Sequence, residues 1–166
     1  CMERIKKNDP AAMRFMGTEH YHEGDYETAF EYFAKAAELG DADAHYNLSV
    51  LYRKGEGVEK DMKKQVYHLE EAAIAGHPTA RHNLGIVEYE NGSYERAKKH
   101  FIIAANLGYN DSLKNVKALY AEGHASKEDY AGSLRAYQAA VEATKSVERE
   151  EAEMFYKSFH EHEAAR

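Results

Sequence analysis

Residues 41–76 read DADAHYNLSVLYRKGEGVEKDMKKQVYHLEEAAIAG and contain two segments in which apolar residues recur at helical spacing. The apolar positions are Ala44, Leu48, Leu51 and Tyr52 in the first segment, and Met62, Val66, Leu69, Ala72 and Ala73 in the second. This spacing places the apolar residues of each segment on one face of a helix. The glycine-bearing stretch 55–57 between them predicts a loop. Two short amphipathic helices bury only part of their apolar surface against each other, so the unit must pack against further units.

The same helix-loop-helix unit recurs four times, over residues 9–40, 41–76, 77–108 and 109–144. When the copies are aligned, the second helix has a small residue at one position and a large residue at another. These are Ala36, Ala72, Ala104 and Ala140 at the small position, and Phe33, Leu69, Phe101 and Tyr137 at the large position. Alanine lets two helices approach closely, and the large residue fills the adjoining space. The sequence therefore predicts an all-α solenoid of four antiparallel helix pairs.

Glycines predict helix ends and close helix contacts. Gly40, Gly76 and Gly108 follow three of the second helices, where a left-handed C-cap favours glycine. Gly17 and Gly85 lie inside first helices, where glycine is less favourable than alanine by about 1 kcal/mol. We therefore expect another helix to approach both of them closely.

The two ends of the chain differ from the repeats. Residues 1–8 are polar and basic and are interpreted as a lead-in or a fragment boundary, after which Asp9 and Pro10 fit the cap and first position of a helix. Residues 145–166 are highly charged and predict a C-terminal capping helix and tail, with Ser146 as its N-cap. The apolar side of that helix consists of Ala152, Phe155, Tyr156 and Phe159.

Composition and charge disfavour several classes of function. The 166 residues include 22 Lys and Arg against 29 Asp and Glu, and the net charge of −7 disfavours general binding to nucleic acid. No apolar run reaches the length of a membrane span, so we expect no membrane insertion. Cys1 is the single cysteine, which excludes an intrachain disulfide and favours a reducing, cytoplasmic setting.

The motifs of copies two and three resemble those of the Sel-one-like repeat family, a relative of the tetratricopeptide repeat. In copy two they are Asn47-Leu48-Ser49 with Tyr52, GEGVEKD at 55–61, Glu71-Ala72-Ala73 and Gly76-His77, and in copy three they are Ala80, Asn83-Leu84-Gly85, Ala104-Ala105 and Gly108. Copies one and three have the shorter turns Gly24-Asp25-Tyr26 and Gly92-Ser93-Tyr94, which look more like the tetratricopeptide version. The resemblance covers about residues 9–144.

This resemblance implies a right-handed superhelix that serves as a non-catalytic adaptor for a protein or peptide partner. Some members of the family carry a zinc-binding ring-type domain ahead of the repeats, so a role as the substrate-recruiting part of a ubiquitin ligase is an alternative. A cysteine-rich branch with proposed antibiotic binding or hydrolysis is a poor match, because this chain has no cysteine pairs.

Asn47, Asn83 and Asn115 occupy the same position in three first helices, and we call them the ladder asparagines. A repeated side-chain amide can donate and accept hydrogen bonds, so these residues could bind the backbone of an extended peptide. The alternative is that each amide bonds a neighbouring helix and fixes the stacking. In similar tetratricopeptide arrays this position lines the concave face. The other residues expected on the same face are Arg14, Tyr21, Tyr46, Arg53, His82, Tyr89 and Lys114.

The sequence contains no phosphate-binding glycine loop, nucleophile elbow or zinc-protease helix, so we expect no catalytic residue and no cofactor. We also expect no metal site, because His68 and His100 recur in successive units about 10 Å apart. A further alternative is a homodimer formed through an outer face of copy one. That face comprises Phe15, Tyr32 and Phe33.

Overall fold

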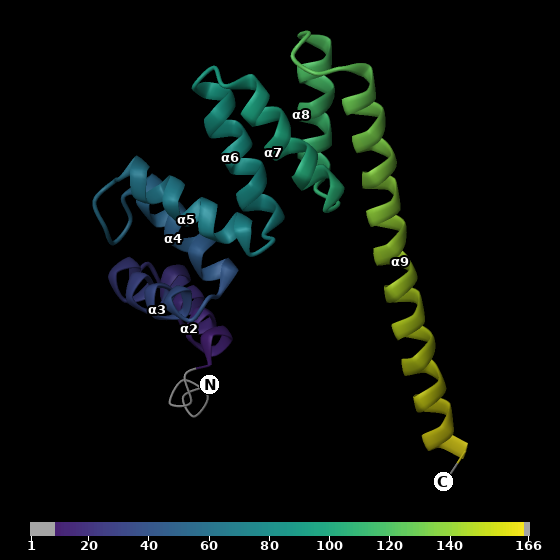
Figure 1. Cartoon of the computed structure of the whole chain (residues 1–166). Helices are drawn as coiled ribbons and strands as arrows, with labels where there is room; N and C mark the ends of the chain where they lie inside the picture. Colours follow the sequence, from purple (N-terminus) through teal and green to yellow (C-terminus); the bar gives the residue numbers. More distant parts are fainter. Residues whose placement is uncertain (1–8, 165–166) are drawn as a thin grey trace.

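The computed structural model describes residues 9–164, apart from the side chains of 149, 152–153 and 155–164 (Figure 1). The described chain forms eight helices and no strand. The helices are α2 (Pro10–Glu23), α3 (Tyr26–Glu38), α4 (Ala42–Lys54), α5 (Met62–Ile74), α6 (Pro78–Glu90), α7 (Tyr94–Asn106), α8 (Asn110–Ala121) and α9 (Lys127–Ala164). No helix in this part of the chain is long and apolar enough to cross a membrane.

The helices pack in consecutive pairs, and the pairs stack in chain order. Within the first three pairs, α2 packs on α3, α4 on α5 and α6 on α7. Each second helix also contacts the first helix of the next pair, and α9 contacts both α7 and α8. Figure 1 shows the pairs following one another along a curved array. The predicted all-α solenoid of four helix pairs is confirmed.

Small and large side chains alternate in the core of the array, as the aligned copies predicted. Ala36, Ala72 and Ala104 are fully buried. Their large neighbours on the same helices are exposed by at most 2%, namely Phe33 at 2%, Leu69 at 1% and Phe101 at 1%. Ala140 and Tyr137 of the fourth copy are only partly buried. The small and large positions of the second helix are therefore buried in three copies and only partly buried in the fourth.

Two glycines allow the paired helices to approach closely. A Cβ atom at Gly17 would lie 2.7 Å from the Phe33 ring, and one at Gly85 would lie 2.5 Å from the Phe101 ring. Both distances are below those of real carbon contacts, so glycine is required for this packing. The close contacts expected at Gly17 and Gly85 are confirmed.

The helix ends follow the expected cap chemistry. Asp9 accepts hydrogen bonds from the backbone N–H groups of Ala11 and Ala12 at the start of α2, and Pro10 occupies the first position of that helix. Gly40, Gly76 and Gly108 have φ angles of +85°, +91° and +85°. This left-handed conformation ends α3, α5 and α7.

The C-terminal helix differs from the prediction. Instead of a separate helix that begins at Ser146, α9 runs without a break from Lys127 to Ala164. Its first part packs on the repeats, where Ser133 is 2% exposed. From Glu142 to Glu148 every side chain is exposed, and Figure 1 shows this part of α9 extending away from the other helices. The expected apolar side of the capping helix lies among side chains that the structure does not describe.

Candidate functional site

The ladder asparagines lie on the face formed by α2, α4, α6 and α8, which we call the first-helix face. Asn47 on α4, Asn83 on α6 and Asn115 on α8 are all partly buried. None of the three side-chain amides forms a hydrogen bond with another described residue. The alternative in which each amide bonds a neighbouring helix therefore gains no support from the described contacts, and the amides are free to bond water or a ligand.

Two pockets open at corresponding places on the first-helix face. The first pocket, of about 320 Å³, lies between α2 and α4, and the second pocket, of about 220 Å³, lies between α6 and α8. Each contains one ladder asparagine and the large residue of the intervening second helix. The first pocket is lined by Thr18, Tyr21, His22, Phe33, Tyr46, Asn47 and Val50, and the second by Ile86, Tyr89, Phe101, Asn115, Ala118, Leu119 and Glu122. The structure thus groups Tyr21, Tyr46 and Asn47, and separately Tyr89 and Asn115.

A tyrosine hydroxyl stands at each pocket and bonds a charged residue of the next repeat. The Tyr21 hydroxyl donates to Glu56 at 3.1 Å and accepts a hydrogen bond from the Lys54 ammonium at 2.7 Å. The Tyr89 hydroxyl donates to Glu122 at 3.1 Å. The bond to Tyr21 raises the pKa of Lys54, and the bond to Glu122 raises the pKa of Tyr89. Both side chains therefore stay protonated near neutral pH.

Three of the predicted ligand-binding residues contact the residue that begins the next repeat. The pairs are Arg14 with Asp41 at 3.1 Å, Tyr46 with His77 at 4.6 Å between ring centroids, and His82 with Tyr109 at 4.9 Å between ring centroids. His82 also bonds the buried hydroxyl of Ser112 at 2.8 Å. These side chains therefore help to hold neighbouring repeats together, a role that sequence reasoning did not assign to them.

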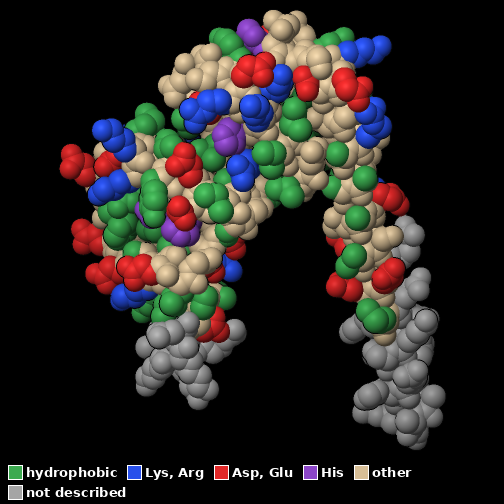
Figure 2. Space-filling model, viewed as in Figure 1, with side chains coloured by type: hydrophobic (Ala, Val, Ile, Leu, Met, Phe, Trp, Pro, Cys, Tyr) green, Lys and Arg blue, Asp and Glu red, His purple; other side chains and the backbone are tan. Residues whose placement is uncertain are grey.

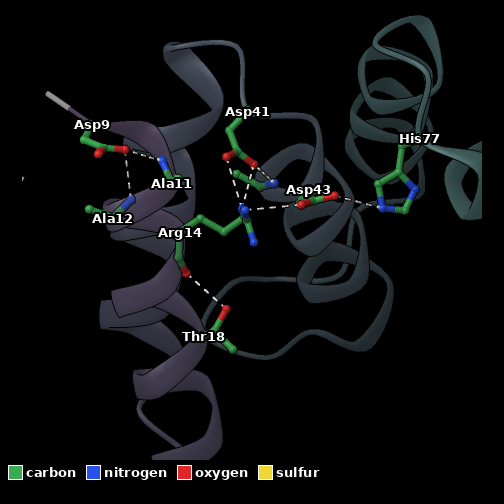
Figure 3. Close-up of polar contacts among 9 residues, drawn as sticks. Asp9, Ala11, Ala12, Arg14, Thr18, Asp41, Asp43 and His77 are labelled. Carbon is green, nitrogen blue, oxygen red and sulfur yellow. Dashed lines mark hydrogen bonds and ion pairs between the residues drawn. The ribbon is translucent and has the colours of Figure 1, made fainter. Parts of the chain in front are cut away.

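A chain of polar contacts links the first three repeats (Figure 3). The Arg14 guanidinium lies within 3.4 Å of Asp43, and the other oxygen of Asp43 lies 3.4 Å from Nε2 of His77. Nδ1 of His77 accepts a hydrogen bond from the Ala80 N–H group at 3.1 Å, so the ring proton is on Nε2. Burial lowers the pKa of His77, although the Asp43 carboxylate acts in the opposite direction. The neutral ring caps α6.

The remaining two predicted residues differ in their surroundings. Arg53 is exposed and forms no ion pair with a described residue. Lys114 is exposed and bonds Asp111 on the same helix at 2.7 Å, which raises the pKa of Lys114. Of the two, only Arg53 offers an unpaired charge.

Sequence reasoning missed a histidine pair between α4 and α5. Nδ1 of His45 lies 3.0 Å from Nδ1 of His68, and the His68 ring stacks on Tyr52 with centroids 5.5 Å apart. Burial is the main cause that lowers the pKa of His68 to about 4. The two histidines could have been brought together by reasoning that α4 and α5 pack antiparallel. Among the described residues, no group of three metal-binding side chains is suitably placed for an ion.

The outer face proposed for copy one is only partly present. Phe15 is 54% exposed, but Phe33 is 2% exposed because it packs against Gly17. Tyr32 stacks on the ring of His20 with centroids 5.6 Å apart. The prediction that Phe33 belongs to an exposed dimer face is therefore wrong.

The stacked helix pairs place the chain in the class of α-solenoid repeat proteins. Within that class, the chain belongs to the Sel1 repeat family, whose sequence pattern matches residues 10–41, 42–77 and 78–109. Sel1 repeat proteins are typically protein-interaction scaffolds and are generally non-catalytic. The fourth helix pair lies beyond the matched segments.

Comparison with known proteins also relates this chain to Sel1 repeat proteins. A crystal structure of a Sel1 repeat protein from Oxalobacter formigenes has a TM-score of 0.69 and 29% identity, over 82% of this chain and 60% of that chain. DAP3-binding cell death enhancer 1 of Mus musculus is 40% identical over 167 residues, which cover 76% of this chain and 33% of that protein. The putative beta-lactamase HcpC of Helicobacter pylori strain J99 is 40% identical over 60 residues, which cover 36% of this chain and 21% of that protein. The chain spans a third or less of these two curated relatives.

Proposed function

We propose that the first-helix face binds a segment of another protein and that the chain acts as a non-catalytic adaptor. The observation that carries this proposal is the set of partly buried ladder asparagines without a described hydrogen-bond partner. Asn47 and Asn115 each lie beside apolar side chains in a pocket. An amide next to an apolar pocket can bond a peptide backbone while the pocket takes a side chain.

The names of two relatives bear on this proposal in different ways. The mouse relative is named for binding another protein, DAP3, which is consistent with an adaptor role. HcpC is named a putative beta-lactamase, but it matches only 60 residues. This chain has a single cysteine and no recognisable nucleophile motif. We therefore favour protein binding over hydrolysis.

Affinity capture with the full chain, followed by calorimetric titration of the captured protein, tests this function. Each lost amide hydrogen bond removes about 0.5–1.5 kcal/mol of binding free energy. We therefore expect the double variant Asn47→Ala, Asn83→Ala to bind about 5-fold to 150-fold more weakly. Asn106→Ala is the matched control, because Asn106 is an exposed asparagine on the second helix α7. Equal affinity of the wild type and the double variant would remove this role from the asparagines.

A further inference from the structure

The two pockets are copies of one site, repeated two repeats apart. Tyr21 and Tyr89, Phe33 and Phe101, and Asn47 and Asn115 occupy corresponding positions in the two pockets. A ligand that lies along the first-helix face, as the proposed function requires, therefore meets the same kind of pocket twice. Each pocket has mostly apolar walls and room for one large apolar side chain.

An apolar line joins the pockets. Val50 lines the first pocket, and Ile86 and Ala118 line the second. The three residues occupy corresponding positions on α4, α6 and α8, three residues after each ladder asparagine. A chain held by the asparagines therefore runs beside apolar surface from one pocket to the other.

The charges at the two pockets are opposite. Lys54 and Glu122 occupy corresponding positions, and each bonds the tyrosine hydroxyl of a pocket. Lys54 forms an ion pair with Glu56, which balances its charge. The neighbouring Arg53 forms no ion pair with a described residue, so one positive charge remains unbalanced. Glu122 and the exposed Glu90 have no described cation partner. The first pocket is therefore bordered by net positive charge and the second by net negative charge.

Other cations on this face do not alter that difference. Arg14 is paired with Asp41 and Asp43, and Lys114 is paired with Asp111. Their charges are balanced by carboxylates within 3.4 Å. Lys117 on α8 also forms no ion pair with a described residue, but it occupies the position of Gly17 and Gly85, which face the second helix of their own pair. Beside the pocket tyrosines, the residues that leave a charge unbalanced are Arg53 at the first pocket, and Glu90 and Glu122 at the second.

The spacing of the repeats sets the length of a matching ligand. Neighbouring packed helices lie about 10 Å apart, so pockets two repeats apart are separated by about 20 Å. An extended chain advances about 3.3 Å per residue. About six residues of extended chain therefore separate the side chains that would enter the two pockets.

We propose that the partner of the first-helix face is an extended peptide segment with two large apolar side chains about six residues apart. The apolar side chain that enters the first pocket has an acidic residue beside it, and the apolar side chain that enters the second pocket has a basic residue beside it. This inference rests on the proposed function and adds the chemistry and direction of the ligand. The opposite charges at the two pockets fix the direction in which the segment lies.

Selection of random 12-residue peptides on the immobilised full chain, at low ionic strength, tests this inference. The expected result is enrichment of peptides that have two large apolar residues five to seven positions apart, with acidic residues near one and basic residues near the other. The control Val50→Trp, Ala118→Trp fills both pockets and should abolish binding of the enriched peptides. Circular dichroism of this control variant is used to check that its helices are intact.

A charge-exchange variant tests the direction. Arg53→Glu, Glu90→Arg and Glu122→Lys together make the first pocket negative and the second positive. Arg53 and Glu90 contact no described charged group, so we expect the variant to fold normally. It should bind the enriched peptide at least tenfold more weakly and the peptide with inverted charges more tightly.

The outcomes separate this inference from the proposed function. Enriched peptides that need open pockets but show no charge order, or that bind the charge-exchange variant equally well, would overturn the inference and leave the proposed function standing. No enrichment, or enrichment that survives the filled pockets, would overturn both.

Discussion

The contact between Gly85 and Phe101 shows how one residue sets the distance between two helices. A Cβ atom at Gly85 would lie 2.5 Å from the ring. We predict that Gly85→Ala lowers the free energy of unfolding by about 1–3 kcal/mol, because α6 and α7 must move apart. Urea unfolding followed by circular dichroism measures this change.

The matched control is Gly132→Ala in α9. A Cβ atom there has its nearest neighbour at 3.9 Å, so only helix propensity changes. This substitution should stabilise the protein by about 0.5–1 kcal/mol. Equal effects at both positions would mean that the contact with Phe101 does not limit the packing.

His68 makes the stability of the protein depend on pH. Its pKa is about 4 in the folded chain and about 6.5 in the unfolded chain, so the unfolded chain binds the proton more readily. The stabilisation is complete above pH 6.5 and is lost as the pH falls from 6.5 to about 4. Because the ring is only partly buried and solvent screens its charge, we expect a loss of about 2 kcal/mol.

The dependence on His68 is measured by comparing urea unfolding of the wild type and of His68→Gln at pH 7 and pH 4. The variant should lose less stability over this range than the wild type. His77, His82 and His100 also have lowered pKa values and contribute a remainder of the same sign. The same pH dependence in both proteins would refute the assignment to His68.

For individual residues, the sequence was sufficient to predict that the ladder asparagines share one face, but not to predict the contacts of the residues around them. Repetition of an asparagine at one position is visible in the sequence. The contacts of Arg14, Tyr46 and His82 are not visible, because their partners Asp41, His77 and Tyr109 lie about thirty residues away and differ in chemistry. The pairing of His45 with His68 was missed for the same reason.

The caps of individual helices determine where repeats begin. His77 caps α6 through Nδ1, which accepts from the Ala80 N–H group at 3.1 Å. We predict that His77→Ala lowers the free energy of unfolding by about 1 kcal/mol. His77→Asn should lower it by much less, because asparagine is a good N-cap. Urea unfolding at pH 7 measures both variants. A larger loss for Asn than for Ala would contradict the capping role.

The continuity of α9 has a simple chemical reason. Glycines end α3, α5 and α7, but Thr144 stands at the corresponding position in copy four and no glycine or proline follows it. Threonine and serine lower helix propensity only slightly, so the helix continues past Ser146. The sequence contains this information, but the change to a highly charged composition after residue 144 favours a separate helix that begins at Ser146.

The exposed part of α9 adds little to the stability of the repeats. The described side chains from Glu142 onward are all exposed, including Val147 at 53% and Met154 at 63%. We predict that ending the chain at Thr144 changes the free energy of unfolding by less than about 1 kcal/mol. Thermal unfolding of both chains tests this prediction. A large loss would show that the segment 145–166 packs on the repeats.

The whole molecule follows from the repetition of a unit that cannot bury its apolar surface alone. Because each pair contacts only its neighbours, the all-α array was predictable from the period and the aligned small and large residues. The space-filling view shows an arch with a hollow between the repeats and the described part of α9 (Figure 2). The extent of α9 beyond the repeats does not follow from the repeat period, because this helix continues past the end of the fourth copy.

We propose that the first-helix face binds the partner through the side-chain amides of the ladder asparagines. The most direct measurement is NMR of ¹⁵N-labelled full chain during titration with the captured partner. We expect the side-chain amide signals of Asn47, Asn83 and Asn115 to shift together, while that of Asn106 on α7 stays in place. A shift of the Asn106 signal with no change in the other three would place the partner on the opposite face and rule out binding through the ladder asparagines.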